Sequence, residues 1–78
     1  MRVHFHTNQY EFAHGKKPRG QGTWWFTATY LTGDGRSMED EPFSIPFSTF
    51  TEAKREANAK VRADAPGRAN EVDVEVMS

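Results

Sequence analysis

The pattern of apolar and polar side chains predicts strands in three segments of the chain and a helix in one. Residues 2–7 and 70–76 alternate between apolar and polar positions, which is the period of half-buried strands, and residues 23–31 are rich in aromatic and β-branched side chains between glycines. Residues 49–64 instead carry apolar side chains three or four positions apart, at Phe50, Ala53, Ala57 and Val61. Segments rich in glycine or proline separate these elements. The pattern therefore indicates a small protein that combines a sheet with one helix.

The segment Thr23–Leu31 is the longest aromatic and β-branched run in the chain, and we expect it to form a central strand. Because side chains alternate across a strand, Trp24 and Trp25 must point to opposite faces. The predicted helix presents mostly alanines, which allow close packing on a sheet that supplies large side chains. We therefore expect Trp24, with Phe26 and Tyr30, to be buried beneath the helix and Trp25 to be exposed.

The segment between the first two predicted strands is less regular. Tyr10 and Phe12 reverse the parity of the first strand, so either a bulge near Asn8 and Gln9 restores the facing or the strand ends there and turns. We favour a bulged or bent first strand. Residues 14–22 hold three glycines and one proline without a large apolar side chain. This composition predicts an exposed loop that joins the first strand to the aromatic strand.

A third strand, antiparallel to the second, is expected over residues 36–45, after a glycine-rich turn at 32–35. Pro42 and Pro46 lack amide donors, so this strand belongs at an edge of the sheet. Its apolar contacts are expected from Met38, Phe43, Ile45 and Phe47.

The helix and the last strand complete the predicted topology. Thr49 and Glu52 have the spacing of a capping box, and Pro66 stops the helix. A strand–helix–strand crossover joins parallel strands, so we place the last strand beside the first. The sequence thus predicts one α+β domain over residues 1–78. Its sheet is four-stranded and antiparallel-dominated, with β-β-β-α-β connectivity, strand order 3-2-1-4 and the helix packed on one face.

Charge is divided unevenly along the chain, although the formal net charge is only -1. Up to Arg36 there are five Lys or Arg against two acidic residues, and after Arg36 there are nine acidic residues against five basic ones. In the predicted sheet the outward carboxylates of the last strand lie beside the outward basic row of the first, where opposite charges pair. The two rows are Glu71, Asp73 and Glu75, and Arg2, His4 and His6.

The composition of the chain limits which kinds of binding site it can form and which cellular compartment we expect for it. The chain has no cysteine, so neither disulfides nor thiolate metal ligands are available. No apolar run approaches the roughly 20 residues of a membrane span, and no signal-peptide pattern opens the chain. We therefore expect no membrane contact and a cytoplasmic location.

Catalytic and cofactor motifs are absent from the sequence. It holds neither a nucleophile elbow nor a phosphate-binding or dinucleotide-binding fingerprint. His4 and His6 share one strand face and, with His14 nearby, suggest metal ligands, but the carboxylate row explains them as cross-strand partners. We expect a non-catalytic protein with no metal and no cofactor.

The strongest candidate binding site is the basic loop beside Trp25. Cationic side chains bind phosphates, and an exposed indole offers a stacking platform. The alternative is a solvated loop with a tryptophan covered by neighbouring side chains or by a second copy of the chain, so a homodimer stays open. The predicted partner-binding residues are Lys16, Lys17, Arg19, Trp25 and Arg36.

An acidic surface is the alternative contact. Alternate residues of a strand lie about 6.6 Å apart, close to the phosphate spacing along a nucleic-acid strand. The last strand therefore has the spacing to imitate DNA for a basic partner, whereas the internal pairing with the first strand explains the same row. We favour the internal pairing. The acidic surface comprises Glu39, Asp40, Glu41, Glu71, Asp73 and Glu75.

In size and architecture the chain resembles the small anti-CRISPR proteins that phages use against Cascade-type complexes. The shared features are a short cysteine-free domain, an aromatic antiparallel strand at Trp24–Leu31, one helix at Thr49–Asp64 and segregated charge. The resemblance implies an inhibitor in the host cytoplasm that docks on a host CRISPR-Cas effector complex and blocks target-DNA binding or nuclease recruitment. The alternative is a small nucleic-acid-binding module that uses the basic loop and Trp25.

Overall fold

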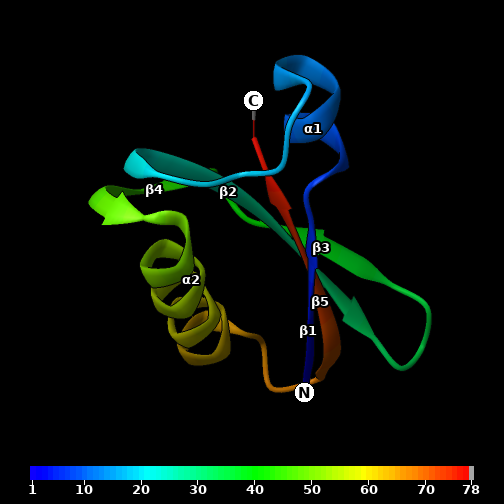
Figure 1. Ribbon diagram of the computed structural model, residues 1–78. Coiled ribbons are helices and arrows are strands. Elements are labelled where there is room, and N and C mark those ends of the chain that lie inside the picture. The colour runs from blue at the N-terminus through cyan, green and yellow to red at the C-terminus, as the bar shows by residue number, and fades with distance from the viewer. Residues whose placement is uncertain (78) are drawn as a thin grey trace.

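The computed structural model describes residues 1–77 and confirms an α+β fold in which one helix packs on a mixed sheet (Figure 1). Within residues 1–77 the sheet has five strands and there are two helices, where the sequence predicted four strands and one helix. The elements are β1 (Arg2–His6), α1 (Asn8–His14), β2 (Gln21–Thr32), β3 (Ser37–Glu39), β4 (Phe43–Thr49), α2 (Phe50–Asp64) and β5 (Ala69–Val76).

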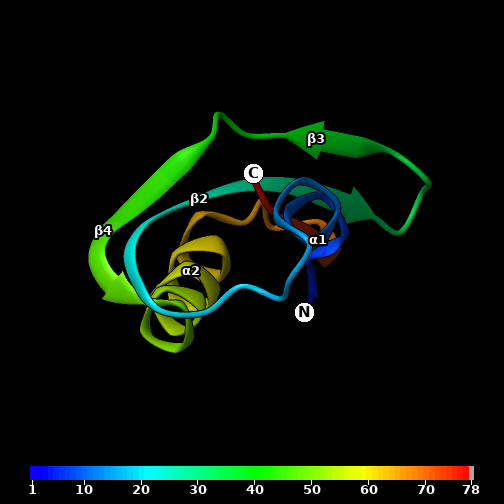
Figure 2. The same ribbon diagram turned by 45° about the horizontal axis from the view of Figure 1, so that its top comes forward.

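β2 is the strand around which the sheet is built. On one side it pairs antiparallel with β5 from Phe26 to Thr32. On the other side its first half pairs with β4 and its second half with β3, both antiparallel. Figure 2 shows β2 and β4 curving around α2, which lies on the concave side of the sheet. A long aromatic strand thus supplies one wall of the core.

The predicted strand order is wrong in one respect. β5 lies between β1 and β2, so the order is β1-β5-β2-β3, with β4 also paired to β2. The reason is visible in the burial of the three inward valines of β5, Val72, Val74 and Val76, which are fully buried. Such a strand needs a neighbour on each side, whereas β1 contributes only the half-buried Val3 and Phe5 and lies at the edge.

The predicted parallel pairing of the first and last strands is confirmed. Arg2 pairs with Glu71, His4 with Asp73 and His6 with Glu75 in the register of β1 and β5. The period-2 pattern of both strands places their apolar residues on the α2 side and their charged residues on the opposite face. The basic and acidic rows therefore lie side by side, as expected.

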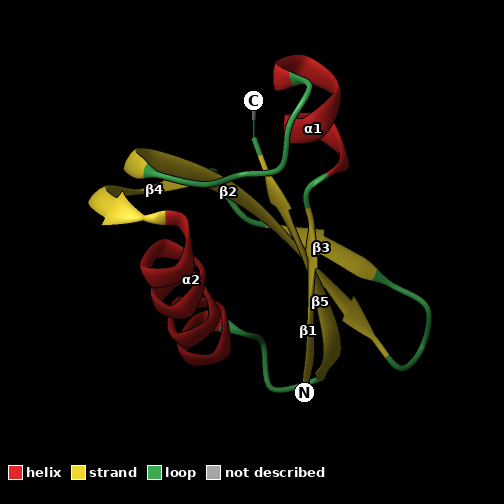
Figure 3. Cartoon of the chain, viewed as in Figure 1, coloured by secondary structure: helices red, strands yellow, loops and turns green. Residues whose placement is uncertain are grey.

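The predicted bulge in the first strand is also wrong, because residues 8–14 form the helix α1 (Figure 3). Tyr10 and His14 are four residues apart, so a helix brings their rings together at 4.2 Å between centroids. Tyr10 also packs against Trp24, at 5.5 Å between ring centroids. The helix ends at Gly15, whose positive φ of 69° suits glycine.

The third predicted strand is divided into two. Residues 40–42 separate β3 from β4, and Pro42 immediately precedes β4. Ile45 is buried and Phe43 packs partly against the core, as predicted. Met38 and Phe47, which were expected to supply apolar contacts, are exposed.

The helix and the two tryptophans behave as predicted. The Thr49 side chain accepts a hydrogen bond from the Glu52 backbone N–H at 3.2 Å, and Ala53, Ala57 and Val61 are buried. Trp24 is 7% exposed and Trp25 is 49% exposed. The small side chains of α2 thus lie over the large side chains of β2, which is how the core reaches a dense packing.

Candidate functional site

A cavity of about 310 Å³ lies where α1, the loop after it and the start of β2 meet. The half-exposed indole of Trp25 forms part of its wall, and the guanidinium-bearing side chain of Arg19 forms another part. α1 contributes the stacked rings of Tyr10 and His14. Arg19 and Trp25 therefore line one cavity, whereas Lys16 and Lys17 do not line it.

The neighbouring residue in β2 explains why Trp25 is exposed at this position. The Trp24 indole is turned into the core, where its Nε1 donates a hydrogen bond to the Ser48 carbonyl at 3.0 Å. Its ring also packs against Phe50 at 5.0 Å between centroids. Strand alternation then directs Trp25 to the face opposite α2.

The loop before β2 carries three cationic side chains. Lys16, Lys17 and Arg19 are exposed, and no ion pair within residues 1–77 involves them. Both ends of this loop reach the cavity, through His14 on one side and Arg19 on the other. We call Lys16, Lys17, Arg19 and Trp25 the aromatic–basic surface.

The structure does not bring Arg36 to this surface. Arg36 follows the opposite end of β2, where its Nε lies 3.6 Å from Asp34 Oδ2. A hydrogen bond from the Thr32 hydroxyl lowers the pKa of Asp34, and the Arg36 backbone N–H adds to this effect. A separate cavity of about 300 Å³ contains Arg36 together with Met38 and Arg68. Arg36 is thus part of the β2–β3 turn.

Each carboxylate of the β5 row lies near a polar side chain of β1 or α1. His4 Nε2 lies 4.0 Å from Glu71 Oε2, and His6 Nε2 lies 2.9 Å from Asp73 Oδ1. Each histidine thus reaches the carboxylate two residues before its Cα partner. The third carboxylate, Glu75, accepts a hydrogen bond from Gln9 Nε2 at 2.7 Å. These contacts support the internal pairing that the sequence favoured.

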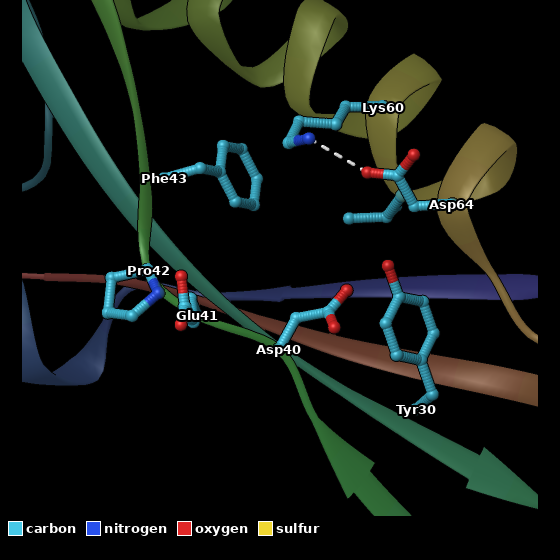
Figure 4. A pocket seen from close by; sticks show the side chains of 8 residues that line it. Tyr30, Asp40, Glu41, Pro42, Phe43, Lys60 and Asp64 are labelled. Carbon is cyan, nitrogen blue, oxygen red and sulfur yellow. Dashed lines mark hydrogen bonds and ion pairs between the residues drawn. The ribbon is translucent and has the colours of Figure 1, made fainter.

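The other predicted acidic residues lie along the β3–β4 edge. Glu39 and Asp40 share a cavity of about 260 Å³ with Glu75 of β5, on the face opposite α2. Asp40 and Glu41 also line the largest cavity, of about 390 Å³, between this edge and α2 (Figure 4). Asp73 lines a third cavity, of about 250 Å³, with His6 and Glu75. The predicted acidic residues therefore do not gather at one site.

The largest cavity combines carboxylates with aromatic walls. Figure 4 shows the Tyr30 hydroxyl between Asp40 and Asp64, while Lys60 Nζ lies 2.8 Å from Asp64 and 5.3 Å from the Phe43 ring centroid. Burial raises the pKa of Tyr30 to about 12, and the negative charges of Asp40 and Asp64 and a hydrogen bond with Asp40 add to the effect. The phenol therefore stays protonated to a more alkaline pH than an exposed tyrosine does.

One surface residue that sequence reasoning misplaced is Phe47. Its side chain is 88% exposed, and its φ of 53° is the only positive value at a non-glycine among residues 1–77. A register shift in the pairing of β2 with β4 leaves Pro46 and Phe47 opposite the single residue Thr23. The sequence signal is weak, because an apolar residue in a strand is expected to face the core.

The structure gives no sign of a metal site or a membrane-spanning helix within residues 1–77. Within residues 1–77, no three or more His, Cys, Asp or Glu side chains gather as a metal-binding group would require. No helix in that part of the chain has the length and apolar character to cross a membrane. Protein-family models, curated proteins and solved structures gave no match to the chain. Function must therefore be argued from the surface itself.

Proposed function

We propose that the protein is a non-catalytic inhibitor that binds a host protein complex through the aromatic–basic surface. The observation that carries the proposal is the placement of a half-exposed tryptophan beside Arg19, at a loop whose cations have no ion-pair partner within residues 1–77. Unpaired cations next to an exposed aromatic residue are typical of contact surfaces, in which tryptophan and arginine often contribute most of the binding energy.

The resemblance to small anti-CRISPR proteins gives this proposal a specific partner. We propose that the partner is a CRISPR-Cas effector complex of the Cascade type and that binding obstructs target DNA or nuclease recruitment. The acidic row of β5 is less suited to the contact, because Glu71, Asp73 and Glu75 already have partners within the chain. Arg36 is separated from the surface by the length of β2.

The proposal is tested with purified Cascade-type complexes and labelled target DNA. The wild-type protein is expected to bind at least one complex stoichiometrically and to block either DNA binding or cleavage by the recruited nuclease. Trp25→Ala and Arg19→Ala should weaken inhibition, whereas Arg55→Ala removes an exposed arginine of α2 and should not. Equal inhibition by all four proteins would show that the surface has been assigned wrongly.

A nucleic-acid-binding module is the second candidate, and the contact of Arg19 and Trp25 with one cavity favours it too. Cations that neutralise phosphates make affinity fall steeply with salt, and exposed aromatics stack on bases. A gel shift with random DNA across a salt series separates the two candidates. Salt-sensitive binding that disappears when Lys16 and Lys17 are both replaced by alanine would favour the nucleic-acid module over the inhibitor.

A further inference from the structure

We propose that Phe47 is an aromatic anchor that inserts into an apolar pocket of the partner protein, next to partner carboxylates that meet the aromatic–basic surface. The inference rests on the proposed function and adds the chemistry of the partner's contact. Three features of Phe47 support it: its exposure, its backbone conformation and its position relative to Trp25.

Phe47 is so exposed that packing in the core does not explain why a phenylalanine stands at this position. Phe26 is fully buried, and Phe43 and Phe50 pack partly against the core, whereas 88% of the Phe47 side chain faces solvent. Phe12 is the only phenylalanine of the described chain that is more exposed, at 95%, and it lies on the ordinary helical backbone of α1. Removing the Phe47 ring therefore removes almost no core packing.

Phe47 also has a left-handed backbone conformation, which is unusual for a phenylalanine. Left-handed φ values are costly for bulky side chains and are readily adopted by glycine and asparagine. The bulge opposite Thr23 requires a residue with this conformation, but it does not require a phenyl ring. The backbone is thus strained at Phe47, although the phenyl ring makes almost no packing contact within the chain. Strain of this kind gathers at functional sites, and bulges often re-aim side chains.

Phe47 lies close to the aromatic–basic surface along the β2–β4 ribbon. Trp25 pairs with Ser44 of β4. The bulge that contains Phe47 lies opposite Thr23, two residues before Trp25 in β2, which corresponds to about 7 Å along the strand. Thr23, which lies opposite the bulge, and its neighbour Gly22 line the same cavity as Arg19 and Trp25. An exposed aromatic ring beside unpaired cations is complementary to an apolar pocket with acidic side chains at its rim.

The distribution of charge favours a protein over a nucleic acid as the occupant. Thr27, the next residue after Trp25 on the same strand face, pairs with Glu75, and Thr29 pairs with both Asp73 and Glu39. A nucleic-acid strand that continued along this face would therefore meet carboxylates. A protein pocket that closes around Phe47 needs to contact only the aromatic end of the sheet.

The test measures stability and binding for two matched phenylalanine variants. Phe47→Asn keeps a residue that tolerates the left-handed backbone, and Phe12→Ala removes the other strongly exposed ring. We expect neither variant to have a lower Tm than the wild type. In titrations with a Cascade-type complex, Phe47→Asn should raise Kd about 30-fold, as for a buried aromatic hot spot. Phe12→Ala should leave Kd unchanged, and Phe47→Trp should retain most of the affinity.

Each other outcome overturns a distinct part of the account. If the wild type binds and Phe47→Asn binds equally well, the inference fails and the proposed function stands. If no complex binds the wild type, both fail. A large fall in Tm for Phe47→Asn would make Phe47 a structural residue and overturn its role as an anchor. Phe47-dependent binding of short single-stranded DNA, or Phe47-dependent dimers in sedimentation, would overturn the choice of partner.

Discussion

The replacement Trp24→Phe tests whether the fold depends on the inward tryptophan of β2 in the way that the structure indicates. Trp24 makes three kinds of contact that the smaller ring loses or weakens. Its Nε1 donates to the Ser48 carbonyl at 3.0 Å, and its ring packs against Phe50 and against Tyr10 of α1. Phenylalanine keeps an aromatic ring at this site but has no donor and less volume.

The expected loss follows from these contacts. The hydrogen bond contributes about 1 kcal/mol, and the missing volume leaves a small cavity that costs about 1 kcal/mol more. The free energy of unfolding should therefore fall by about 2 kcal/mol, which lowers the Tm of a domain of this size by about 8–16 °C. The full truncation Trp24→Ala should cost about 3–5 kcal/mol. That is a large part of the roughly 4–12 kcal/mol available to a chain of this length.

Urea denaturation followed by circular dichroism measures these losses, with Trp25→Phe as the matched control. Trp25 is half exposed and makes no side-chain hydrogen bond within residues 1–77, so its replacement should change the free energy of unfolding by less than about 0.5 kcal/mol. A loss at Trp25 that equals or exceeds the loss at Trp24 would refute the assignment of the two sheet faces. It would also remove the basis for the aromatic–basic surface.

Three further predictions concern the helix, its packing and a buried phenol. Thr49→Ala removes the acceptor for the Glu52 N–H and should destabilise the protein by about 1 kcal/mol in urea denaturation, whereas a loss near zero would mean that the cap is dispensable. Ala57→Leu overfills a fully buried site beneath the sheet and should cost about 1–3 kcal/mol, and an unchanged stability would contradict the close packing of α2. Because the folded state holds Tyr30 protonated up to a pKa of about 12, its contribution is complete below pH 10.0 and is lost as the pH rises toward that value. Wild-type stability should thus fall by about 2–3 kcal/mol more than that of Tyr30→Phe over this range, and parallel pH profiles would contradict it.

The alternation of apolar and polar residues was sufficient to predict much of the fold. The valines of β5 and the charged residues on both sides of them specified a strand, its inward face and its pairing with β1. Alternation also separated Trp24 from Trp25, and the alanines of α2 indicated which of the two lies beneath the helix. In these elements the local pattern and the tertiary packing favour the same arrangement.

The strand order could not be obtained in the same way. Placing β5 at the edge or between β1 and β2 keeps the same parallel neighbour, and the choice depends on how completely its valines must be covered. The alternating pattern of a strand does not show how completely its inward face is covered. Within residues 8–14, the four-residue spacing of Tyr10 and His14 was the available signal for a helix, but the alternating pattern before it favoured a continued strand.

The candidate surface was partly accessible from the sequence. The basic loop and the outward tryptophan were recognised, and the structure places Arg19 and Trp25 at one cavity. Arg36 was grouped with them through charge alone, although the length of β2 separates it from the loop. Phe47 was expected to make apolar contacts because it is an apolar residue beside a predicted strand. Its exposed, left-handed position depends on a bulge that only the pairing of two strands creates.

The most direct test of the central claim is to titrate the wild-type protein or Trp25→Ala into a Cascade-type complex and then add labelled target DNA. Binding of the DNA and its cleavage by the recruited nuclease are measured. Stability must be measured on the same preparations, so that loss of folding is separated from loss of binding. We predict stoichiometric inhibition by the wild-type protein and strongly weakened inhibition by Trp25→Ala, while the variant stays folded at the assay temperature. Inhibition that survives the loss of Trp25, or no inhibition by the wild-type protein, would contradict this prediction.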